Sequence, residues 1–282
     1  FNTTIATQIY AKICFEATNS QKKIIENLSE YLSDDDFSRI FVLNGFAGTG
    51  KTTLIAALVA ALKELRIKPV LLAPTGRAAK VLARYCGEQA LTIHKRIYRQ
   101  RTNADYESKF SLDFNREQGA VFIVDEASML SDSTGDGALF GSGSLLEDLA
   151  SYVRSGRGCR LILVGDSAQL PPVGCDFSPA LDPATVSRYG EVVYGLMDEV
   201  VRQQMQSGIL FNATLVRCML ENRIYEIPKF EMDYPDFESV EGGDFMEKLQ
   251  DAFDRYGRDE VIVITRSNKR ANRYNDGIRR YI

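Results

Sequence analysis

The sequence predicts an α/β fold in which a doubly wound, mostly parallel sheet is covered by helices on both faces. Short apolar runs of strand length alternate with segments whose apolar residues recur at helical spacing. Continuous apolar runs are typical of strands that are buried on both faces, as parallel strands between two helix layers are. The four clearest runs are 40–43, 69–73, 121–124 and 160–164.

The composition agrees with a globular protein of this class. The chain has 282 residues, 45% of them hydrophobic and 26% charged, which suits one large or two modest α/β domains. The longest apolar run, 54–62, is far too short to cross a bilayer, so we expect no membrane association. The N-terminus lacks the basic segment and apolar core of a secretion signal. Because the chain starts with Phe1, we expect the numbered sequence to be incomplete.

The cysteines indicate where in the cell the protein is expected, and the net charge limits the kinds of nucleic-acid binding that are expected. The five cysteines are odd in number and widely spaced, and the single histidine excludes most zinc patterns. We therefore expect reduced thiols and a cytoplasmic location. A net charge of −4 argues against a uniformly basic nucleic-acid coat protein, but it leaves room for a local basic groove.

A glycine-rich segment between the first apolar run and a helix carries the clearest chemistry. It has the pattern Gly-x-x-x-x-Gly-Lys-Thr, in which glycines let backbone N–H groups turn toward phosphate oxygens. Lys51 would reach the β- and γ-phosphates, and the Thr52 hydroxyl would ligate Mg²⁺. A chance glycine-rich turn is the alternative. The predicted nucleotide contacts are Gly45, Ala47, Gly48, Thr49, Gly50, Lys51, Thr52 and Thr53.

Polar residues at the ends of two later strands would complete a nucleotide-hydrolysing site. The run 121–124 ends in Asp125 and Glu126, of which the first would hold the Mg²⁺ shell and the second would deprotonate the attacking water. The alternative is a strand-end aspartate that caps a helix. Gln169, in the stiff loop after the fourth run, could sense the γ-phosphate.

Gln21 has two interpretations, which the sequence leaves open. It lies near the start of a helix whose apolar stripe continues to Leu32, and with Thr18 it could form a capping box. It also lies some twenty residues before the phosphate loop, where a glutamine can contact the adenine edge.

Two further segments are candidate binding sites, one for a ligand at the edge of the sheet and one for a nucleic acid. The run 69–73 leads into Pro74-Thr75-Gly76-Arg77, which would place a hydroxyl and a cation at the carboxyl edge of the sheet. The segment 91–101, which includes Thr92 and His94, interleaves basic and aromatic side chains that suit a phosphodiester backbone with stackable bases. A plain strand–helix connection and a solvated charged face are the alternatives.

The alternation of strand-like apolar runs and helix-like segments begins again near residue 190. An apolar run there is followed by a helix over about 207–220, another strand over 261–265 and a basic helix-like end. We therefore expect an ATP-binding domain over 1–189 and a partial second α/β domain over 190–282.

Taken together, these motifs resemble those of the superfamily 1 DNA helicases of the RecD-like branch. The phosphate loop is shared by many families. Far more specific is its combination with Gly165-Asp166-Ser167-Ala168-Gln169-Leu170-Pro171-Pro172-Val173 and Pro74-Thr75-Gly76-Arg77-Ala78-Ala79. The resemblance extends from residue 18 to about 280 and also includes 18–21, 92–94, 125–128 and 200–203.

The resemblance implies a RecA-like P-loop NTPase domain followed by the beginning of a second RecA-like domain, with ATP between the two. It assigns adenine to Gln21, the phosphates and Mg²⁺ to Lys51 and Thr52, and the metal to Asp125. Glu126 becomes the catalytic base. The remaining implied roles are a γ-phosphate sensor (Gln169), a charge stabiliser from the second domain (Arg202), and DNA contacts (Thr75, Arg77, Thr92 and His94).

The resulting hypothesis is an ATP-dependent DNA helicase or translocase that moves along single-stranded DNA, with 5′ to 3′ polarity implied by the resemblance. The alternatives are a P-loop ATPase of another class, such as a loader or remodelling machine, and a nucleotide-binding fragment without helicase activity of its own. We expect a monomer rather than a hexamer. The family's late motifs, Thr-x-His-x-x-Gln-Gly and aromatic-Val-Ala-x-Thr-Arg, are absent from this sequence, so we expect the chain to stop partway through the second domain.

Overall fold

The computed structural model describes residues 2–13, 16–102, 108–132, 140–200, 207–257 and 259–281. The chain divides into two compact units. The first unit comprises Phe1–Gln206 and Ala213–Glu226, and the second comprises Ser207–Asn212 and Ile227–Ile282.

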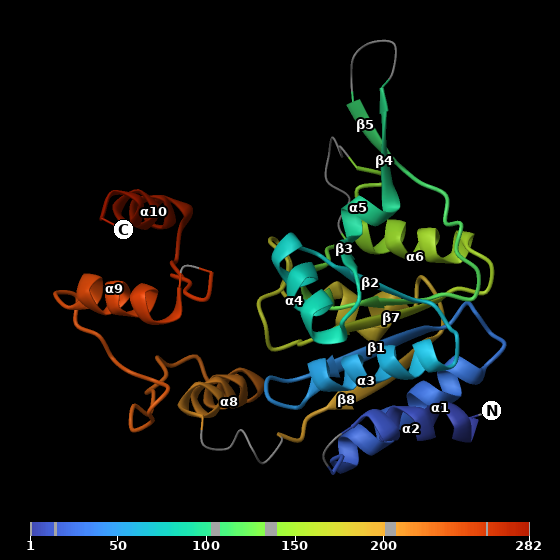
Figure 1. The fold of residues 1–282 in the computed structure, drawn as a ribbon, viewed down its shortest axis with the longest axis horizontal. Helices are drawn as coiled ribbons and strands as arrows, with labels where there is room; N and C mark the ends of the chain where they lie inside the picture. Colours follow the sequence, from blue (N-terminus) through green and yellow to red (C-terminus); the bar gives the residue numbers. More distant parts are fainter. Residues whose placement is uncertain are drawn as a thin grey trace. The chain divides into compact units, whose positions relative to one another are not determined.

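A six-stranded parallel sheet organises the first unit (Figure 1). Its strand order is β3-β2-β6-β7-β1-β8, so the central strand β1 has a parallel neighbour on each side. This confirms the predicted doubly wound parallel fold. The strands are β1 (Ile40–Gly45), β2 (Pro69–Ala73), β3 (Ala90–Thr92), β6 (Val121–Val124), β7 (Arg160–Gly165) and β8 (Val192–Met197).

Two separate apolar cores lie on the two faces of this sheet, and β1 contributes to both. Phe41 and Leu43 pack into one core, whereas Ile40 and Val42 pack into the other, as the two-residue period of a strand requires. The first core is completed by α1 (Asn2–Lys12), α2 (Asn19–Ser33), α3 (Lys51–Glu64) and α4 (Gly76–Cys86). The second core is completed by α5 (Ile93–Ile97), α6 (Leu145–Ser155), α7 (Pro183–Val186) and the 3₁₀ turns η1 (Ala127–Met129) and η2 (Pro179–Leu181).

Two features of the first unit were not expected from the sequence. The apolar run after residue 190 is β8, which pairs with β1 from Ile40↔Val192 to Gly45↔Met197, so the expected boundary at 190 falls within this unit. A run of β-branched and aromatic residues cannot show which sheet it will join, because its partners lie far away in the chain. The basic segment after α5 forms an antiparallel hairpin, β4 (Tyr98–Thr102) with β5 (Ser108–Leu112), which projects from the α5 side of the sheet (Figure 1).

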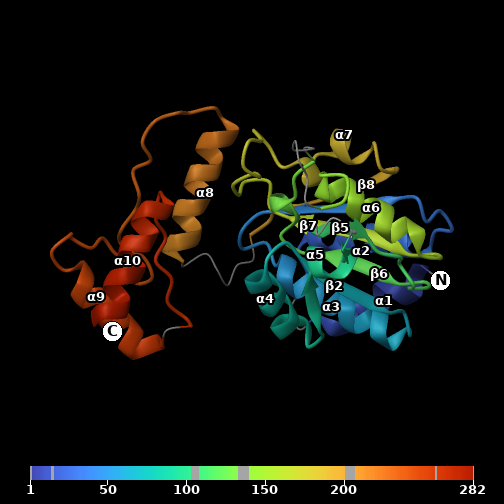
Figure 2. The same cartoon turned by 90° about the horizontal axis from the view of Figure 1, so that it is seen from above.

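The second unit contains helices without a sheet among its described residues. It takes the first residues of α8 (Gly208–Glu221), together with α9 (Phe245–Tyr256) and α10 (Asn268–Tyr281). The last two lie side by side in both ribbon views (Figures 1 and 2), and the rings of Phe245 and Tyr274 are 5.4 Å apart. The expected strand over 261–265 is wrong, because this segment forms no regular secondary structure and pairs with no described strand. No described helix in either unit is both long enough and apolar enough to span a membrane.

Candidate nucleotide site

The phosphate loop, residues 45–52, connects β1 to α3 as expected. The local geometry explains why each of its three glycines is a glycine. Gly48 (φ 75°) and Gly50 (φ 86°) adopt the left-handed conformation that side chains disfavour. A Cβ on Gly45 would lie 2.7 Å from Cγ of Lys51, so this glycine makes room for the lysine stem. The loop therefore has the shape of an anion cradle at the N-terminus of α3.

Lys51 lies inside this cradle, surrounded by oxygen atoms. Its ammonium donates hydrogen bonds to the carbonyls of Gly45 and Phe46, the second at 3.0 Å, and lies 3.8 Å from Asp166 Oδ2. Burial lowers the pKa of Lys51, while the carboxylate of Asp166 acts in the opposite direction. A partly desolvated cation among acceptors of this type is well placed to bind phosphate oxygens.

Asp125 and Glu126 follow β6 at the same edge of the sheet. Burial is the largest cause that raises the pKa of each carboxyl, and the Lys51 ammonium opposes this for both. Glu126 also has φ 55° and ψ 36°, a conformation that costs a residue with a side chain about 1–3 kcal/mol and is concentrated at functional sites. The backbone N–H of Glu126 donates to Asp125 Oδ1 at 3.0 Å, which holds the Asp125 carboxyl against the backbone of Glu126.

Asn44 is a structural part of the site that the sequence reasoning missed. Its amide nitrogen donates to Ser167 Oγ at 2.8 Å and to the Tyr194 hydroxyl at 3.0 Å, while its Oδ1 accepts from the Ser167 N–H at 3.0 Å. These bonds tie the end of β1 to the loop after β7 and to β8. A polar residue inside a fully buried strand was the available signal, because such a group requires partners.

Gln169 and an unexpected arginine lie near the phosphate loop. Gln169 is exposed and lines a cavity of about 180 Å³ together with Phe46 and Arg217. The Arg217 guanidinium stacks 4.2 Å from the centroid of the Phe46 ring, and its side chain is only 16% exposed. No local pattern in the sequence singles out this residue of α8. Arg202, the predicted charge stabiliser, lies outside the described residues.

Gln21 forms the capping box that one of its two interpretations predicted. Thr18 Oγ1 accepts from the Gln21 N–H, and Gln21 Oε1 accepts from the Thr18 N–H at 3.0 Å. The side chain is only 1% exposed. The alternative role, contact with adenine, stays a prediction.

The four predicted DNA contacts meet at another part of the same edge. Thr75 and Thr92 cap the N-termini of α4 and α5, where their hydroxyls accept from the N–H groups of Ala78 and Lys95. Both helices begin beside each other, because Ala73 of β2 is in register with Thr92 of β3. The remaining two, Arg77 and His94, have exposed side chains. His94 also contacts the aromatic ring of Phe140, at 5.1 Å between centroids.

The residues at this edge fit a nucleoside triphosphate with Mg²⁺. The fit rests on the glycine cradle, on the partly buried Lys51, and on Asp125 and Thr52 as oxygen ligands. Among the described residues, no group of three or more His, Cys, Asp or Glu side chains could hold a metal by itself.

The comparisons with known proteins place the chain in a family. The chain belongs to the AAA domain family, which matches residues 17–210. The ATP-dependent RecD2 DNA helicase of Deinococcus radiodurans is 30% identical over 154 residues, which are 55% of this chain and 19% of that protein. The RecBCD enzyme subunit RecD of Mycobacterium tuberculosis is 33% identical over 201 residues, 58% of this chain and 32% of that protein. These relatives confirm the resemblance to the RecD-like branch.

The chain spans about a fifth to a third of the length of these two relatives. Among solved structures, a Pif1 helicase from Bacteroides in complex with ADP-AlF3 and ssDNA is 18% identical. The match covers 88% of this chain and 58% of the Pif1 chain, with a TM-score of 0.48. A likeness of this size adds nothing to the assignment.

Proposed function

We propose that this chain carries the ATP-binding part of an ATP-dependent DNA helicase or translocase. The observation that carries the proposal is the convergence of Lys51, Asp125 and Glu126 at one edge of the parallel sheet, close enough for the lysine charge to act on the pKa of both carboxyls. The similarity to two RecD proteins supports the choice of a DNA motor over other P-loop ATPases.

The residues of the site divide the work of phosphoryl transfer among them. Lys51 would bind the β- and γ-phosphates, and Thr52 and Asp125 would hold Mg²⁺, which would neutralise charge on the phosphates when bound. Glu126 would orient and deprotonate the attacking water, for which a raised pKa makes a carboxylate a stronger base. Gln169 would contact the γ-phosphate, and Arg202 would add positive charge.

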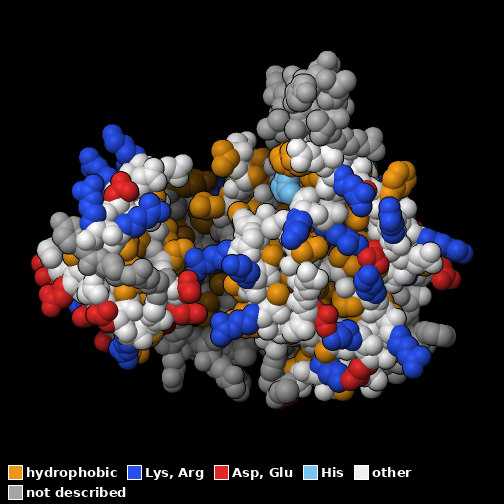
Figure 3. All heavy atoms as spheres, turned by 45° about the horizontal axis from the view of Figure 1, so that its top comes forward, with side chains coloured by type: hydrophobic (Ala, Val, Ile, Leu, Met, Phe, Trp, Pro, Cys, Tyr) orange, Lys and Arg blue, Asp and Glu red, His pale blue; other side chains and the backbone are white. Residues whose placement is uncertain are grey.

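The outer face of α4 supports single-stranded DNA as the partner. Arg77, Lys80, Val81, Arg84 and Tyr85 follow helical spacing and are all exposed. No ion pair of the described residues involves these three cations. On the face drawn in Figure 3, Lys and Arg side chains predominate over acidic ones on the first unit. Such a stripe, with Tyr85 61% exposed, offers charge to phosphates and a ring to a base.

The finer parts of the proposal rest on the sequence and the resemblance. We propose Mg²⁺ as the metal, 5′ to 3′ movement, a monomeric motor and a cytoplasmic location without membrane association.

The test is the ATPase rate of the purified chain with Mg²⁺, measured with and without an unstructured single-stranded oligonucleotide. The proposal expects hydrolysis that rises with the oligonucleotide and falls again at high salt, since phosphate contacts are weakened by salt. Double-stranded DNA and single-stranded RNA of equal length serve as controls. An ATPase that ignores all three nucleic acids would favour a loader or remodelling ATPase instead.

A further inference from the structure

A hollow of about 400 Å³ lies at the foot of the β4–β5 hairpin, where α5 packs against α6 and β4 (Figure 1). It is lined by residues of these three elements and by the loop 113–117. Two of the lining rings, Tyr98 and Tyr152, are 8% and 3% exposed and therefore lie at its floor. Binding sites for small molecules have volumes of about 300–1,000 Å³. The hollow is therefore large enough for a ligand of nucleotide size.

The two carboxylates that line the hollow are already paired with cations. Asp113 Oδ2 lies 2.6 Å from Arg99 Nε. Glu117 forms ion pairs with Arg96 at 2.6 Å and with Lys68 at 2.8 Å. Four cations line the hollow against these two carboxylates, so a surplus of positive charge remains for an anionic ligand.

The surplus comes from Lys95 and Arg116, whose side chains are exposed. No ion pair of the described residues involves either of them. Phe114, which also lines the hollow, is 76% exposed. An exposed ring beside unpaired cations offers a stacking surface to a base and positive charge to a phosphate.

The loop that carries Phe114 and Arg116 is anchored between them by Asn115, which is 7% exposed. The amide nitrogen of Asn115 donates to the Val153 carbonyl at 3.2 Å, and its Oδ1 accepts from the Glu117 N–H at 3.0 Å. The ring and the guanidinium are thus presented from a backbone that is already held in place. Such preorganisation lowers the entropy cost of binding a ligand.

The hollow lies apart from the cationic stripe on α4. That helix packs into the first core, on one face of the sheet, whereas Tyr98 and Tyr152 belong to the second core on the other face. Thr92 and His94 are not among the described residues that line the hollow. A strand that followed α4 would therefore leave the hollow open to a different strand.

We propose that this hollow binds one nucleotide of a second nucleic-acid strand, with the phosphate at Lys95 and Arg116 and the base on Phe114. The inference rests on the proposed function, because it takes a nucleic acid as the partner, and it adds a second binding site. A strand separated from a duplex has both features that the hollow can use, a charged backbone and an unpaired base. An acidic peptide would engage the cations but would make no use of the ring.

The first test compares two DNA substrates, a duplex with one single-stranded arm and the same duplex with two arms. We expect the wild type to bind the two-armed fork about tenfold more tightly, as the stacking of one base implies. Phe114→Leu keeps an apolar side chain but removes the ring, and should abolish this preference, whereas Phe114→Trp should keep it. Because the position is exposed, neither change should affect folding. Affinity for an unstructured single strand should stay within about twofold in both variants.

The charge is tested separately by Arg116→Ala. This variant should reduce the slope of log affinity for the fork against log salt by about 0.7, the value for one phosphate contact on a single strand. The matched control is Lys23→Ala, which removes an exposed cation of α2 and should leave the slope unchanged. A fork preference that survived in both Phe114→Leu and Arg116→Ala would overturn the inference. Equal losses for fork and single strand would overturn it too, because the hollow would then belong to the path of the first strand.

Photocrosslinking identifies the strand that occupies the hollow. We expect 5-iodouracil in the second arm of the fork to crosslink to the tryptic peptide 110–116 of the wild type but not of Phe114→Leu. Binding of poly-glutamate through Arg116 without any fork preference would identify an acidic peptide as the occupant and overturn the inference. A wild-type chain that bound no nucleic acid would contradict the proposed function, whereas normal binding of single strands without a fork preference would contradict the second site alone.

Discussion

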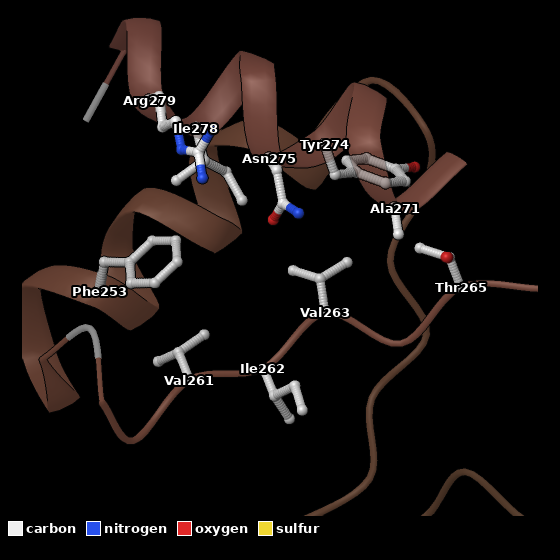
Figure 4. A pocket seen from close by; sticks show the side chains of 10 residues that line it. All are labelled: Phe253, Val261, Ile262, Val263, Thr265, Ala271, Tyr274, Asn275, Ile278 and Arg279. Carbon is white, nitrogen blue, oxygen red and sulfur yellow. The ribbon is translucent and has the colours of Figure 1, made fainter. Parts of the chain in front are cut away.

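Two apolar runs of four residues each have different environments in this protein. Ile40-Phe41-Val42-Leu43 is fully buried in β1, with parallel strands on both sides. Val261-Ile262-Val263-Ile264 pairs with no described strand, and Ile262 and Ile264 are 59% and 87% exposed. Val261, Ile262 and Val263 line a surface hollow of about 510 Å³ with residues of α9 and α10 (Figure 4).

The difference shows what makes an apolar run a strand. Both runs have β-branched residues, so their intrinsic preferences are alike. Among the described strands, only the first run has neighbours that satisfy its backbone N–H and C=O groups on both edges, which a buried strand requires. The predicted chemistry follows the same division, because the phosphate loop and the two carboxyls are at the ends of strands in the first unit. The predictions below test whether function and stability follow it too.

The largest expected effect is on catalysis in the first unit. Lys51→Ala should lower the ATPase rate by at least about 10³-fold, because the loop would lose the cation that stabilises charge developing on the γ-phosphate. The matched control in the second unit is Lys269→Ala, which alters an exposed lysine of α10 and should leave the basal rate unchanged. Turnover near the wild-type rate in Lys51→Ala would refute the phosphate-loop assignment.

The next largest contrast is in stability, between substitutions in the run 40–43 and in the run 261–264. Phe41 is fully buried in β1, so Phe41→Ala should reduce the free energy of unfolding by about 3–5 kcal/mol. The exposed Ile264 should tolerate Ile264→Ala within about 0.5 kcal/mol. Urea denaturation followed by circular dichroism measures both. A comparable loss in Ile264→Ala would mean that the second run is covered in solution.

A smaller but more specific catalytic effect is expected at the end of β6. Glu126→Gln should keep the affinity for MgATP and lower turnover by at least about 10²-fold, the usual size of a general-base contribution. Binding by fluorescence titration and single-turnover hydrolysis separate the two quantities. If binding and turnover fell together, Glu126 would be a metal ligand or a structural residue.

The basic helices of the two units offer a further comparison, between α4 and α10. Arg84→Ala on α4 should weaken single-stranded DNA binding and reduce the slope of log affinity against log salt by about 0.7, the value for one phosphate contact on a single strand. Arg273→Ala on α10 removes an exposed arginine from the other unit and should leave the slope unchanged. Equal reductions in both variants would extend the DNA-binding surface to the second unit.

The smallest expected effect is on the thermal stability of the folded protein, which the buried carboxylate of Asp125 lowers. Burial raises the pKa of Asp125, so its ionised form is disfavoured in the folded protein and lowers stability once the pH exceeds that pKa. Asp125→Asn should therefore raise the melting temperature of the nucleotide-free protein at pH 8, by about 2–4 °C for each kcal/mol recovered. The gain should shrink as the pH falls and the wild-type carboxyl becomes neutral. A lower melting temperature at pH 8 would show that the carboxylate is stabilised in the fold.

The sequence by itself determined the parts of this protein that depend on local pattern. The phosphate loop between a strand and a helix, Asp125 and Glu126 after a buried run, and the capping residue Thr18 are each recognisable within about ten residues. Their positions at strand ends followed as well, because the carboxyl ends of parallel strands share one edge of the sheet.

Only the tertiary structure decided which distant segments meet. It placed β8 in the first sheet and left 261–265 without a partner among the described strands. It also joined Gln21 to Thr49 and Arg217 to Phe46. The physical reason is that hydrogen bonds and packing between remote residues depend on three-dimensional neighbours, while residue type and spacing report only the preferences of each segment.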